Sequence, residues 1–464
     1  MNLKLVVASM SILGLVSCPV FADTQAKKNH HTKKHHRMVK HHKVKHHDYK
    51  DMGSLPVQPA PVEACSVSQA ALILAKSNQD LGRMANPCNT GWFNRVQFSG
   101  GLNVDAGKWG NRNANIMGEN YQRLSLNDVH LDVTATVNEW VKAFASFSYN
   151  TATINDPTDG YAQFPHVSEY DAAYSNNVSS GNSNTFQVEQ AFVTIGNFDS
   201  SPFFVQVGKQ FQDYSQYPLH PITESFTQVL SKTLATSAKV GFITNGFHGS
   251  VAAFDNPTAK VGQTKRPTDY VAAIGYDQVS DQMGFDLGLS YMYDMNGVND
   301  VAYSVNQFTG GGFNTRTGAV ALYGDVNSGP FTVGARWTRA LQRFNPLDLP
   351  KNGVADTTTL AGVSIVNADA SGAKPWAFGI QAGFNFEPIF GCNKNNVYIG
   401  WQTSQDAAGL GLAKSRWLAG YDVEVWKSTK LGVEWDRDIA YSQSRGGSGN
   451  NSNLVSLRAG VEFG

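Results

Sequence analysis

The feature that most constrains this chain is a repeated two-residue alternation of apolar and polar side chains. Residues 128–137 read DVHLDVTATV, which places Val129, Leu131 and Val133 on one face and charged or hydroxyl side chains on the other. The same alternation recurs near residues 285–293, 376–386, 417–425 and 455–463. Such segments are typical of β-strands whose two faces meet different surroundings. We therefore predict an all-β protein.

Sixteen such strands can be predicted, and an even number is typical of a bacterial outer-membrane barrel. The connections between them alternate between short turns and long loops, which is the arrangement of periplasmic turns and extracellular loops. We expect a 16-stranded antiparallel transmembrane β-barrel, whose closure satisfies the backbone hydrogen bonds inside the bilayer. The expected strands span residues 92–104, 124–137, 140–150, 185–196, 203–210, 238–244, 247–254, 270–277, 284–293, 317–325, 331–340, 375–386, 396–403, 417–425, 429–436 and 454–463.

The region before the first strand divides into three parts. Residues 1–22 have the features of a cleaved secretory signal, with lipid attachment at Cys18 as the alternative. Residues 23–61 are a His- and Lys-rich, then Pro-rich tether, and residues 62–90 a short periplasmic helical segment that contacts the barrel rim or a neighbouring subunit. The barrel occupies residues 91–464. The mature residues before it are too few for a domain that fills the lumen.

The tether contains an unusual histidine tract. Residues 27–50 hold eight of the twelve histidines in four adjacent pairs, together with nine Lys or Arg residues. A stretch with so few apolar residues does not hold ligands in the fixed tetrahedral arrangement of a structural zinc site. A solvated basic tether is favoured over loose metal capture and over attraction to anionic envelope polymers. The weak metal-binding candidates are His30, His31, His35, His36, His41, His42, His46 and His47.

Three cysteines remain after the signal, in a compartment that permits disulfides. Cys65 and Cys88 flank the helical segment, and Cys392 lies in a turn expected on the same side of the membrane. Three single pairings are open. The Cys65–Cys88 pair is favoured, although the chain must then fold back after about Asn78, because a straight helix would hold these cysteines too far apart.

Two segments of the predicted barrel resemble a known family. GKQFQDYSQYPLHPITESFTQVLSKTLATSAKVGF at 208–242 and EQAFVTIGNF at 189–198 are similar to the LbtU-type siderophore porins of Gram-negative bacteria, over residues 90–464. The resemblance implies an outer-membrane channel for a small solute, an iron–siderophore complex, without the globular plug of TonB-type receptors. A general diffusion porin and a loop-mediated adhesin are the alternatives.

An enzyme is not expected. The chain contains neither G-x-S-x-G nor H-E-x-x-H, and the histidines outside the tether are scattered over strands and loops. These are His130, His166, His220 and His248. No cofactor is predicted. The expected partners are outer-membrane lipid, a small solute and the barrel assembly machinery, with a homotrimer as one arrangement and no nucleic acid.

The polar faces of the strands define the candidate lumen residues, because the apolar faces must point into lipid. Strands 1 and 16 are neighbours in a closed barrel, so Arg95 and Arg458 are expected on one wall. Either the inward charges pair with one another and keep the channel wet, or the cations draw an anionic ferric carboxylate through the pore. The candidates are Arg95, Lys142, Lys239, Arg336, Arg458, Asp128, Asp132 and Asp422, with Asp286, Glu424 and Glu462 also inward.

One long loop, residues 211–237, contains a helical pattern of its own. Four apolar residues recur at helical spacing after Ser225, a capping residue with Gln228 three positions further on. Such a helix either folds into the mouth of the barrel and narrows the pore or packs on the rim. The constriction candidates are Phe226, Val229, Leu230 and Leu234.

Overall fold

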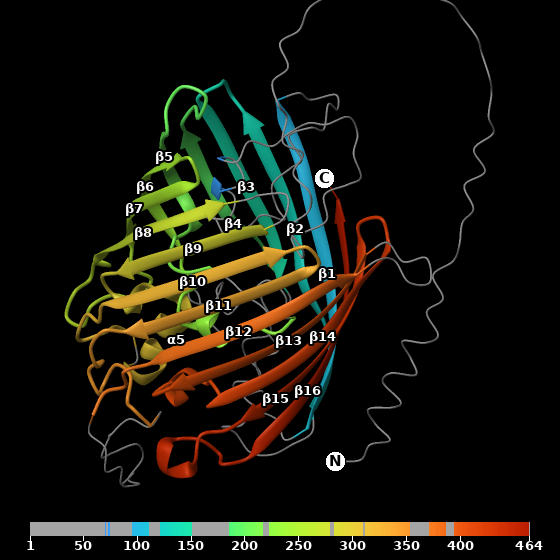
Figure 1. The fold of residues 1–464 in the computed structure, drawn as a ribbon. Coiled ribbons are helices and arrows are strands. Elements are labelled where there is room, and N and C mark those ends of the chain that lie inside the picture. The colour runs from blue at the N-terminus through green and yellow to red at the C-terminus, as the bar shows by residue number, and fades with distance from the viewer. Residues whose placement is uncertain are drawn as a thin grey trace, which may run out of the picture.

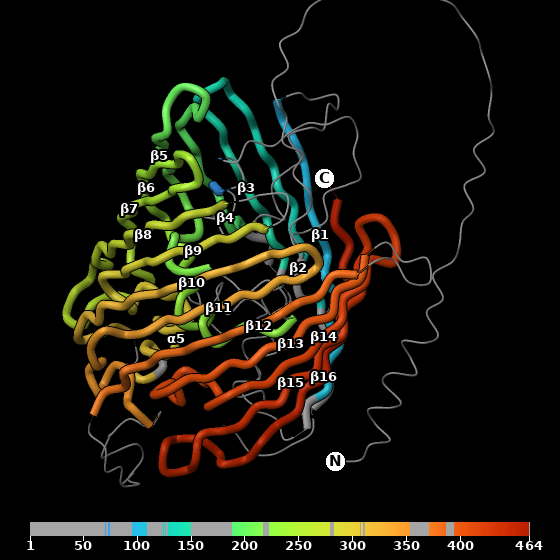
Figure 2. Tube along the Cα trace, in the orientation of Figure 1, coloured from blue at the N-terminus to red at the C-terminus, as the bar shows by residue number. Residues whose placement is uncertain are grey.

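The computed structural model describes residues 70, 73, 74, 95–110, 121–150, 185–216, 222–278, 283–309, 311–352, 371–386 and 394–463. Sixteen strands pair in chain order, and β1 pairs with β16 to close the sheet (Figure 1). The backbone trace shows the tilted strands side by side around the barrel (Figure 2). The predicted 16-stranded antiparallel barrel is therefore confirmed.

All sixteen predicted strands are present, with different ends. The largest differences are that the first strand runs on to Gly110 and the sixth begins at Leu234. The strands are β1 Val96–Gly110, β2 Tyr121–Thr136, β3 Val141–Asn150, β4 Thr185–Ile195, β5 Phe203–Phe211, β6 Leu234–Thr244, β7 Phe247–Asp255, β8 Thr268–Gln278, β9 Met283–Met292, β10 Ala319–Ser328, β11 Phe331–Ala340, β12 Trp376–Phe386, β13 Lys394–Gln405, β14 Ser415–Trp426, β15 Thr429–Ile439 and β16 Asn451–Phe463.

The apolar faces of the strands point outward. On β5, Phe203 and Val207 are exposed, whereas Phe204 and Gln206 between them are buried. Aromatic rings contact one another towards both ends of the strands. At the short-turn end the ring pairs are Phe247–Tyr276 at 4.5 Å and Phe331–Phe384 at 5.0 Å, and towards the long-loop end they are Phe378–Trp401 at 6.1 Å and Trp401–Trp417 at 6.3 Å. An apolar band between aromatic girdles is the outer surface of a transmembrane barrel.

The short turns are held by local side-chain and backbone chemistry. The β6–β7 turn is Asn245-Gly246, with φ values of 49° and 84°, the conformation of a type I′ hairpin turn that favours these two residues. At the β2–β3 turn, the Asn138 Oδ1 atom accepts hydrogen bonds from the Trp140 and Val141 amides, both at 2.9 Å. These turns fix the register of the strands that they join.

Two inward tyrosines lie flat against glycines of the neighbouring strand. A Cβ atom added at Gly288 would stand 2.2 Å from the Tyr323 ring, and one added at Gly420 would stand 2.1 Å from the Tyr398 ring. Only glycine leaves this room, and glycine inside a strand commonly marks such a close approach. The two tyrosine rings are thereby held close against the inner surface of the barrel wall.

The long connections carry the described helices. These are α4 Phe226–Val229, η2 Met295–Gly297, α5 Asn299–Thr309, η3 Ala408–Leu410 and η4 Gln443–Arg445. Among the described residues, no helix is both long and apolar enough to cross a membrane.

A large apolar core, here called the apolar cap, lies at the long-loop end of the barrel. The walls contribute small residues such as Ala252, Ala319 and Ala377, which leave space for larger side chains from the connections. Full burial of one of these large side chains, such as Leu230, contributes about 1.5–3 kcal/mol. The other large members include Tyr214, Phe226, Val229, Met295, Val298, Val301, Val305, Phe313, Phe344, Leu349, Leu410 and Leu412.

Residues from the predicted N-terminal helix contact the inner wall near the short-turn end. Ala70, Ile73 and Leu74 are helical, and Ile73 is 2% exposed because it packs on the inward side chains of Phe204 and Ile243. The signal, the tether with its histidine candidates, and Cys65, Cys88 and Cys392 with their predicted disulfide all lie outside the described residues.

Candidate functional site

Between β5 and β6 the chain leaves the wall as a loop with a narrow neck. The Gln212 amide donates to the Thr233 carbonyl at 2.8 Å. The Gln212 side-chain amide donates to the Gln210 carbonyl at 2.8 Å and to the Ser237 hydroxyl at 3.0 Å. The neck thus continues the β5–β6 pairing. Residues 213–232, here called the crossing segment, form an insertion into the barrel, of which 217–221 are outside the described residues.

The crossing segment first binds the wall beside its own neck through Asp213. The Lys239 ammonium of β6 donates to the Asp213 Oδ1 atom at 2.7 Å, and the Ser250 hydroxyl of β7 donates to Oδ2. Lys239 has no exposed surface and Asp213 only 11% of its side chain. Each buried charge therefore depends on the other, because an unpaired charge in such a site is strongly destabilising.

Gln216 extends this contact to β9 and β11. Its side-chain amide donates to the Asp286 carboxylate at 3.2 Å, and its carbonyl accepts from the Arg336 Nε atom at 3.0 Å. The two terminal nitrogens of Arg336 donate to the two oxygens of Asp325, at 2.9 and 2.7 Å. Residues 213–216 and these wall partners form the near anchor of the crossing segment.

The segment reaches the other side of the barrel at Glu434 of β15. The amides of Ile222 and Thr223 donate to the two Glu434 oxygens at 2.7 and 2.8 Å, and the Thr223 hydroxyl donates at 2.6 Å. The Tyr398 hydroxyl of β13 donates a fourth bond, at 2.8 Å. Glu434 has no exposed surface. These contacts form the far anchor.

Arg416 and Gln402 hold the next residues of the crossing segment. Arg416 of β14 donates to the Glu224 carbonyl at 3.1 Å and lies 5.0 Å from the centre of the Phe226 ring. Its remaining nitrogens bind Asp438 at 2.7 and 2.8 Å. The Phe226 amide donates to the Gln402 Oε1 atom of β13 at 2.8 Å. The far anchor thus covers β13, β14 and β15.

The near anchor begins on the side of the barrel opposite the far anchor, although its contact with Arg336 of β11 lies only two strands from β13. In the closed order of sixteen strands, β14 stands halfway around from β6, so the crossing segment spans the interior. Its helix α4 is short, with the Ser225 hydroxyl accepting from the Gln228 amide at 3.2 Å as predicted for the cap. The chain then returns through the apolar cap to Asn299 of α5, which accepts from the Leu234 amide at 2.8 Å.

All four constriction candidates are buried. Phe226, Val229 and Leu230 belong to the crossing segment and to the apolar cap, at 1%, 3% and 0% exposure. Leu234 is also buried, but it is the first residue of β6 instead of a helical residue. The helix is therefore shorter than predicted, because it ends at Val229 and the chain has entered β6 by Leu234.

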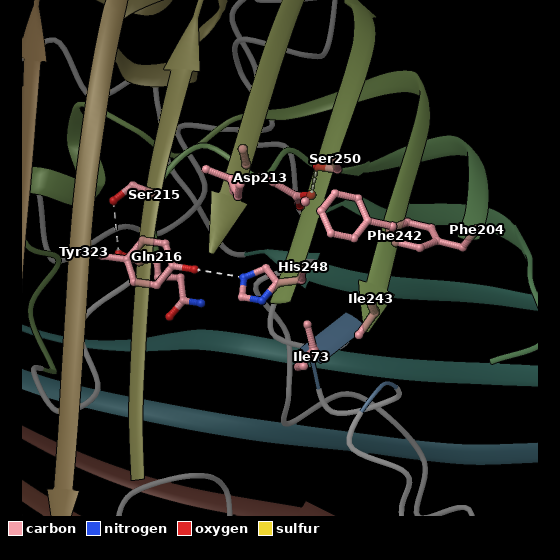
Figure 3. A pocket seen from close by; sticks show the side chains of 13 residues that line it. Ile73, Phe204, Asp213, Ser215, Gln216, Phe242, Ile243, His248, Ser250 and Tyr323 are labelled. Atoms are coloured by element: carbon pink, nitrogen blue, oxygen red, sulfur yellow. Dashed lines mark hydrogen bonds between the residues drawn. The ribbon is translucent and has the colours of Figure 1, made fainter. Parts of the chain in front are cut away.

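A small cavity lies between the near anchor and Ile73 (Figure 3). Its lining combines the polar side chains of Gln216, His248 and Tyr323 with the apolar ones of Phe204 and Phe242, and the Tyr323 hydroxyl is 3.4 Å from the His248 Nε2 atom (Figure 3). Ile73 lies on the side opposite the near anchor. The volume of about 30 Å³ suits about one water molecule, so the cavity is too small for a solute.

Burial controls the titration of two groups in the connections. It raises the pKa of the Tyr214 hydroxyl well above its usual value, and the Asp269 carboxylate adds to the effect. It also raises the pKa of Asp294, although hydrogen bonds from Thr317 and Asn296 oppose the rise. Both effects favour the uncharged form in the apolar cap.

Four of the five predicted lumen cations lie on the inward faces of their strands, and three of these four are paired with a carboxylate. Lys239 binds Asp213 and Arg336 binds Asp325, as described above. Arg458 of β16 donates through Nε and Nη2 to the two oxygens of Asp105 on β1, both at 2.8 Å. The cations are thus paired with carboxylates, but none of the three partners is among the inward acids that the sequence predicted.

The other predicted lumen residues do not form one group with these ion pairs. Arg95 lies in an exposed turn before β1, and the β1–β16 register places Asp105 opposite Arg458 instead. Lys142 on β3 shares the inward face with Ser146 and Ser148 and stands opposite Thr194 of β4, and its side chain is exposed there. The Asp132 carboxylate is fully buried, 3.6 Å from the His130 Nε2 atom. The side chain of Asp128 is outside the described set, Asp422 and Glu424 lie on β14, and Glu462 stands 3.3 Å from Lys430.

Several residues of the paired charges and of the anchors were not predicted. Asp105 was missed because the expected first strand ended before it. Arg416 and Asp438 stand directly opposite each other in the β14–β15 register, so correct strand ends would have indicated their pairing. Asp213 and Glu434 had no such signal, because Asp213 lies in a long connection and Glu434 binds residues of that same connection. No three His, Cys, Asp or Glu side chains in the described ranges are grouped to hold a metal ion.

Known proteins resemble this chain in sequence and fold. A family model described as "Protein of unknown function (DUF3573)" matches residues 97–318. A UPF0422 protein of Coxiella burnetii is 24% identical over 369 residues, covering 77% of this chain and 67% of that protein. One from Legionella pneumophila strain Paris is 24% identical over 370 residues, covering 73% of this chain and 62% of that protein. The chain therefore matches about two thirds of the length of these relatives.

A solved structure supports the barrel fold. Pseudomonas putida OprB superposes with a TM-score of 0.50 at 12% sequence identity, over 80% of this chain and 94% of that protein. At this identity the likeness concerns the fold alone.

Proposed function

We propose that the protein is a porin-type channel of the Gram-negative outer membrane, with its N-terminal segment in the periplasm, and that it admits a small solute. The girdled outer face suits lipid, and the inner wall is polar. The observation that carries the proposal is the crossing segment, which hydrogen bonds to opposite walls. We infer that this segment, whose ends are held by polar contacts and whose Phe226, Val229 and Leu230 pack in the apolar cap, narrows the path through the barrel. In this proposal the protein binds and passes solute and performs no chemistry.

The solute that we propose is an iron–siderophore complex, and the support is the resemblance of residues 189–198 and 208–242 to siderophore porins. Carboxylates suit the guanidinium groups of Arg336 and Arg458. Because both arginines already bind wall aspartates, an anionic complex would have to exchange with those aspartates. We therefore expect passage to depend on the solute's own carboxylates and not on net charge alone.

The neck supplies a sharp test of the channel. Because Gln212 and Thr233 are already hydrogen bonded, residues 213–232 can be replaced by Asn-Gly, which suits a two-residue hairpin turn. We expect a several-fold rise in single-channel conductance in planar bilayers. The control is Asn-Gly exchanged for Gly-Asn at Asn245 and Gly246, which changes a turn outside the interior. Equal conductance of the shortened and natural chains, with the shortened barrel folded, would contradict a constricting role.

The iron proposal needs a separate test. A strain that lacks the gene should grow poorly on a carboxylate siderophore as the iron source, and normally on inorganic iron, and complementation should restore growth. A general diffusion porin would instead show the same loss on unrelated small nutrients. Growth that is equal on all iron sources would contradict the iron proposal and leave the conductance test untouched.

A further inference from the structure

A cleft of about 440 Å³ lies on the outside of the barrel, at the long-loop ends of β11, β12 and β13. These strands are adjacent (Figure 1). The cleft is separate from the crossing segment, because the two occupy opposite faces of the sheet. Its lining is Trp337, Arg339, Arg343, Lys374, Trp376, Gln405 and Asp406.

Strand alternation places the cleft on the lipid side of the wall. On β11, Arg336 and Thr338 are buried inside, whereas Trp337 and Arg339 alternate with them and Arg339 is exposed. Arg339 stands opposite Trp376 on β12, which stands opposite Gln405 on β13. The Trp376 indole N–H donates to the Gln405 Oε1 atom at 3.0 Å. The three side chains therefore form one row across the outer face.

The position of this row along the strands matches the edge of a membrane. Directly below it, towards the middle of the strands, lie the girdle rings of Phe378, Trp401 and Trp417. Aromatic girdles mark the level at which hydrocarbon gives way to lipid headgroups. Because the long loops face the cell exterior, the row stands at the headgroup level of the outer leaflet.

The charges of the cleft are mostly positive. Arg339, Arg343 and Lys374 face only one lining carboxylate, that of Asp406. Asp406 is held by the structure itself, since its Oδ2 atom accepts from the Lys374 backbone amide at 3.4 Å and lies 3.5 Å from the Arg343 Nη1 atom. Arg343 remains 51% exposed. Within the described residues, the Arg339 and Lys374 side chains form no ion pair.

We propose that this cleft binds the phosphate group of an anionic lipid headgroup in the outer leaflet. Arginine presents paired N–H groups that fit phosphate oxygens, and a phosphate monoester carries a charge of about −1.5 to −2 at neutral pH, opposite to the excess in the cleft. Trp337 and Trp376 offer apolar surface for the adjoining sugar or glycerol carbons. The shape, the charge and the depth all fit a phosphorylated lipid that lies against the barrel.

The test uses the full chain, folded in a non-ionic detergent and titrated with diphosphorylated lipid A in native mass spectrometry. The variant combines Arg339→Gln, Arg343→Gln and Lys374→Gln, and we expect it to bind at least about tenfold more weakly than the natural protein. Dephosphorylated lipid A should bind both proteins equally weakly. The matched control is Arg437→Gln, an exposed arginine opposite Trp417 on the same outer face but outside the cleft, which should leave binding unchanged.

Two further arms decide the nature of the ligand. Replacement of both arginines by lysine keeps the charge but removes the paired N–H geometry, so an intermediate affinity is expected. Inorganic phosphate at millimolar concentration should fail to displace the lipid; complete displacement would assign the cleft to a free anion and overturn the proposal. Unchanged lipid binding by the Gln variant would also overturn it. Single-channel conductance should be the same in all variants, so the result is independent of the channel proposal.

Discussion

The two anchors of the crossing segment take their central carboxylates from opposite partners. At the near anchor the segment brings the carboxylate, because Asp213 binds Lys239 of the wall. At the far anchor the wall brings the charge, because Glu434 accepts from two backbone amides and one hydroxyl of the segment. The first contact is therefore an ion pair between two side chains. The second depends mainly on the backbone, which almost any sequence could supply.

This difference indicates which wall residues lose their partners when the crossing segment is displaced. The near wall would keep Lys239 without its carboxylate, which is costly in a buried site. The far wall would keep Glu434 with the Tyr398 hydroxyl at 2.8 Å and would need only water to replace the lost donors. We therefore expect displacement to begin at the far anchor, with the near anchor as the hinge.

The largest effect should come from breaking the near ion pair. Asp213→Ala leaves the fully buried Lys239 unpaired, and we expect a loss of about 3–5 kcal/mol in the free energy of unfolding. Denaturant titration of the detergent-folded barrel measures it. Adding Lys239→Met should restore most of the loss, because removing both charges avoids the uncompensated one. If the double variant is as unstable as the single one, the ion pair is not what holds the near anchor.

An intermediate effect is expected at the far anchor. Glu434→Gln keeps the shape but replaces one accepting oxygen by a donor that faces the donors of the segment. We expect a loss of about 1–3 kcal/mol and noisier single-channel currents as the far end detaches. The control Glu462→Gln changes an inward acid of β16 whose side chain is 38% exposed and should alter neither property. Quiet currents in the Glu434 variant would count against displacement from this end.

The smallest effect should distinguish backbone from side chain at the far anchor. Thr223→Val removes the hydroxyl donor to Glu434 and keeps the two amides, so a loss of about 0.5–1.5 kcal/mol is expected. The same denaturant titration applies, with Thr227→Val of α4 as a buried threonine that does not touch Glu434. A loss as large as that of Glu434→Gln would show that the hydroxyl, and not the backbone, dominates the contact.

The sequence predicted those features of the structure that depend on residues close together along the chain. Alternation along each strand depends only on neighbouring residues, so sixteen strands and the inward positions of Lys239, Arg336 and Arg458 could be predicted. The partners of those cations could not, because Asp105 and Arg458 meet only when the two ends of the sheet close. The contact of Thr223 with Glu434 joins residues 211 positions apart, and no periodic pattern records such a meeting.

The neck at Gln212 and Thr233 has a consequence for how such a chain can change over generations. The hydrogen bond between them completes the hairpin of β5 and β6 before the insertion starts, so the length and composition of residues 213–232 are free of the demands of strand pairing. Insertions in exposed or necked loops are tolerated more readily than changes within paired elements. Under the channel proposal, descendants of this protein could therefore acquire a different crossing segment, and with it admit a different range of solutes, while keeping the same sixteen-stranded barrel.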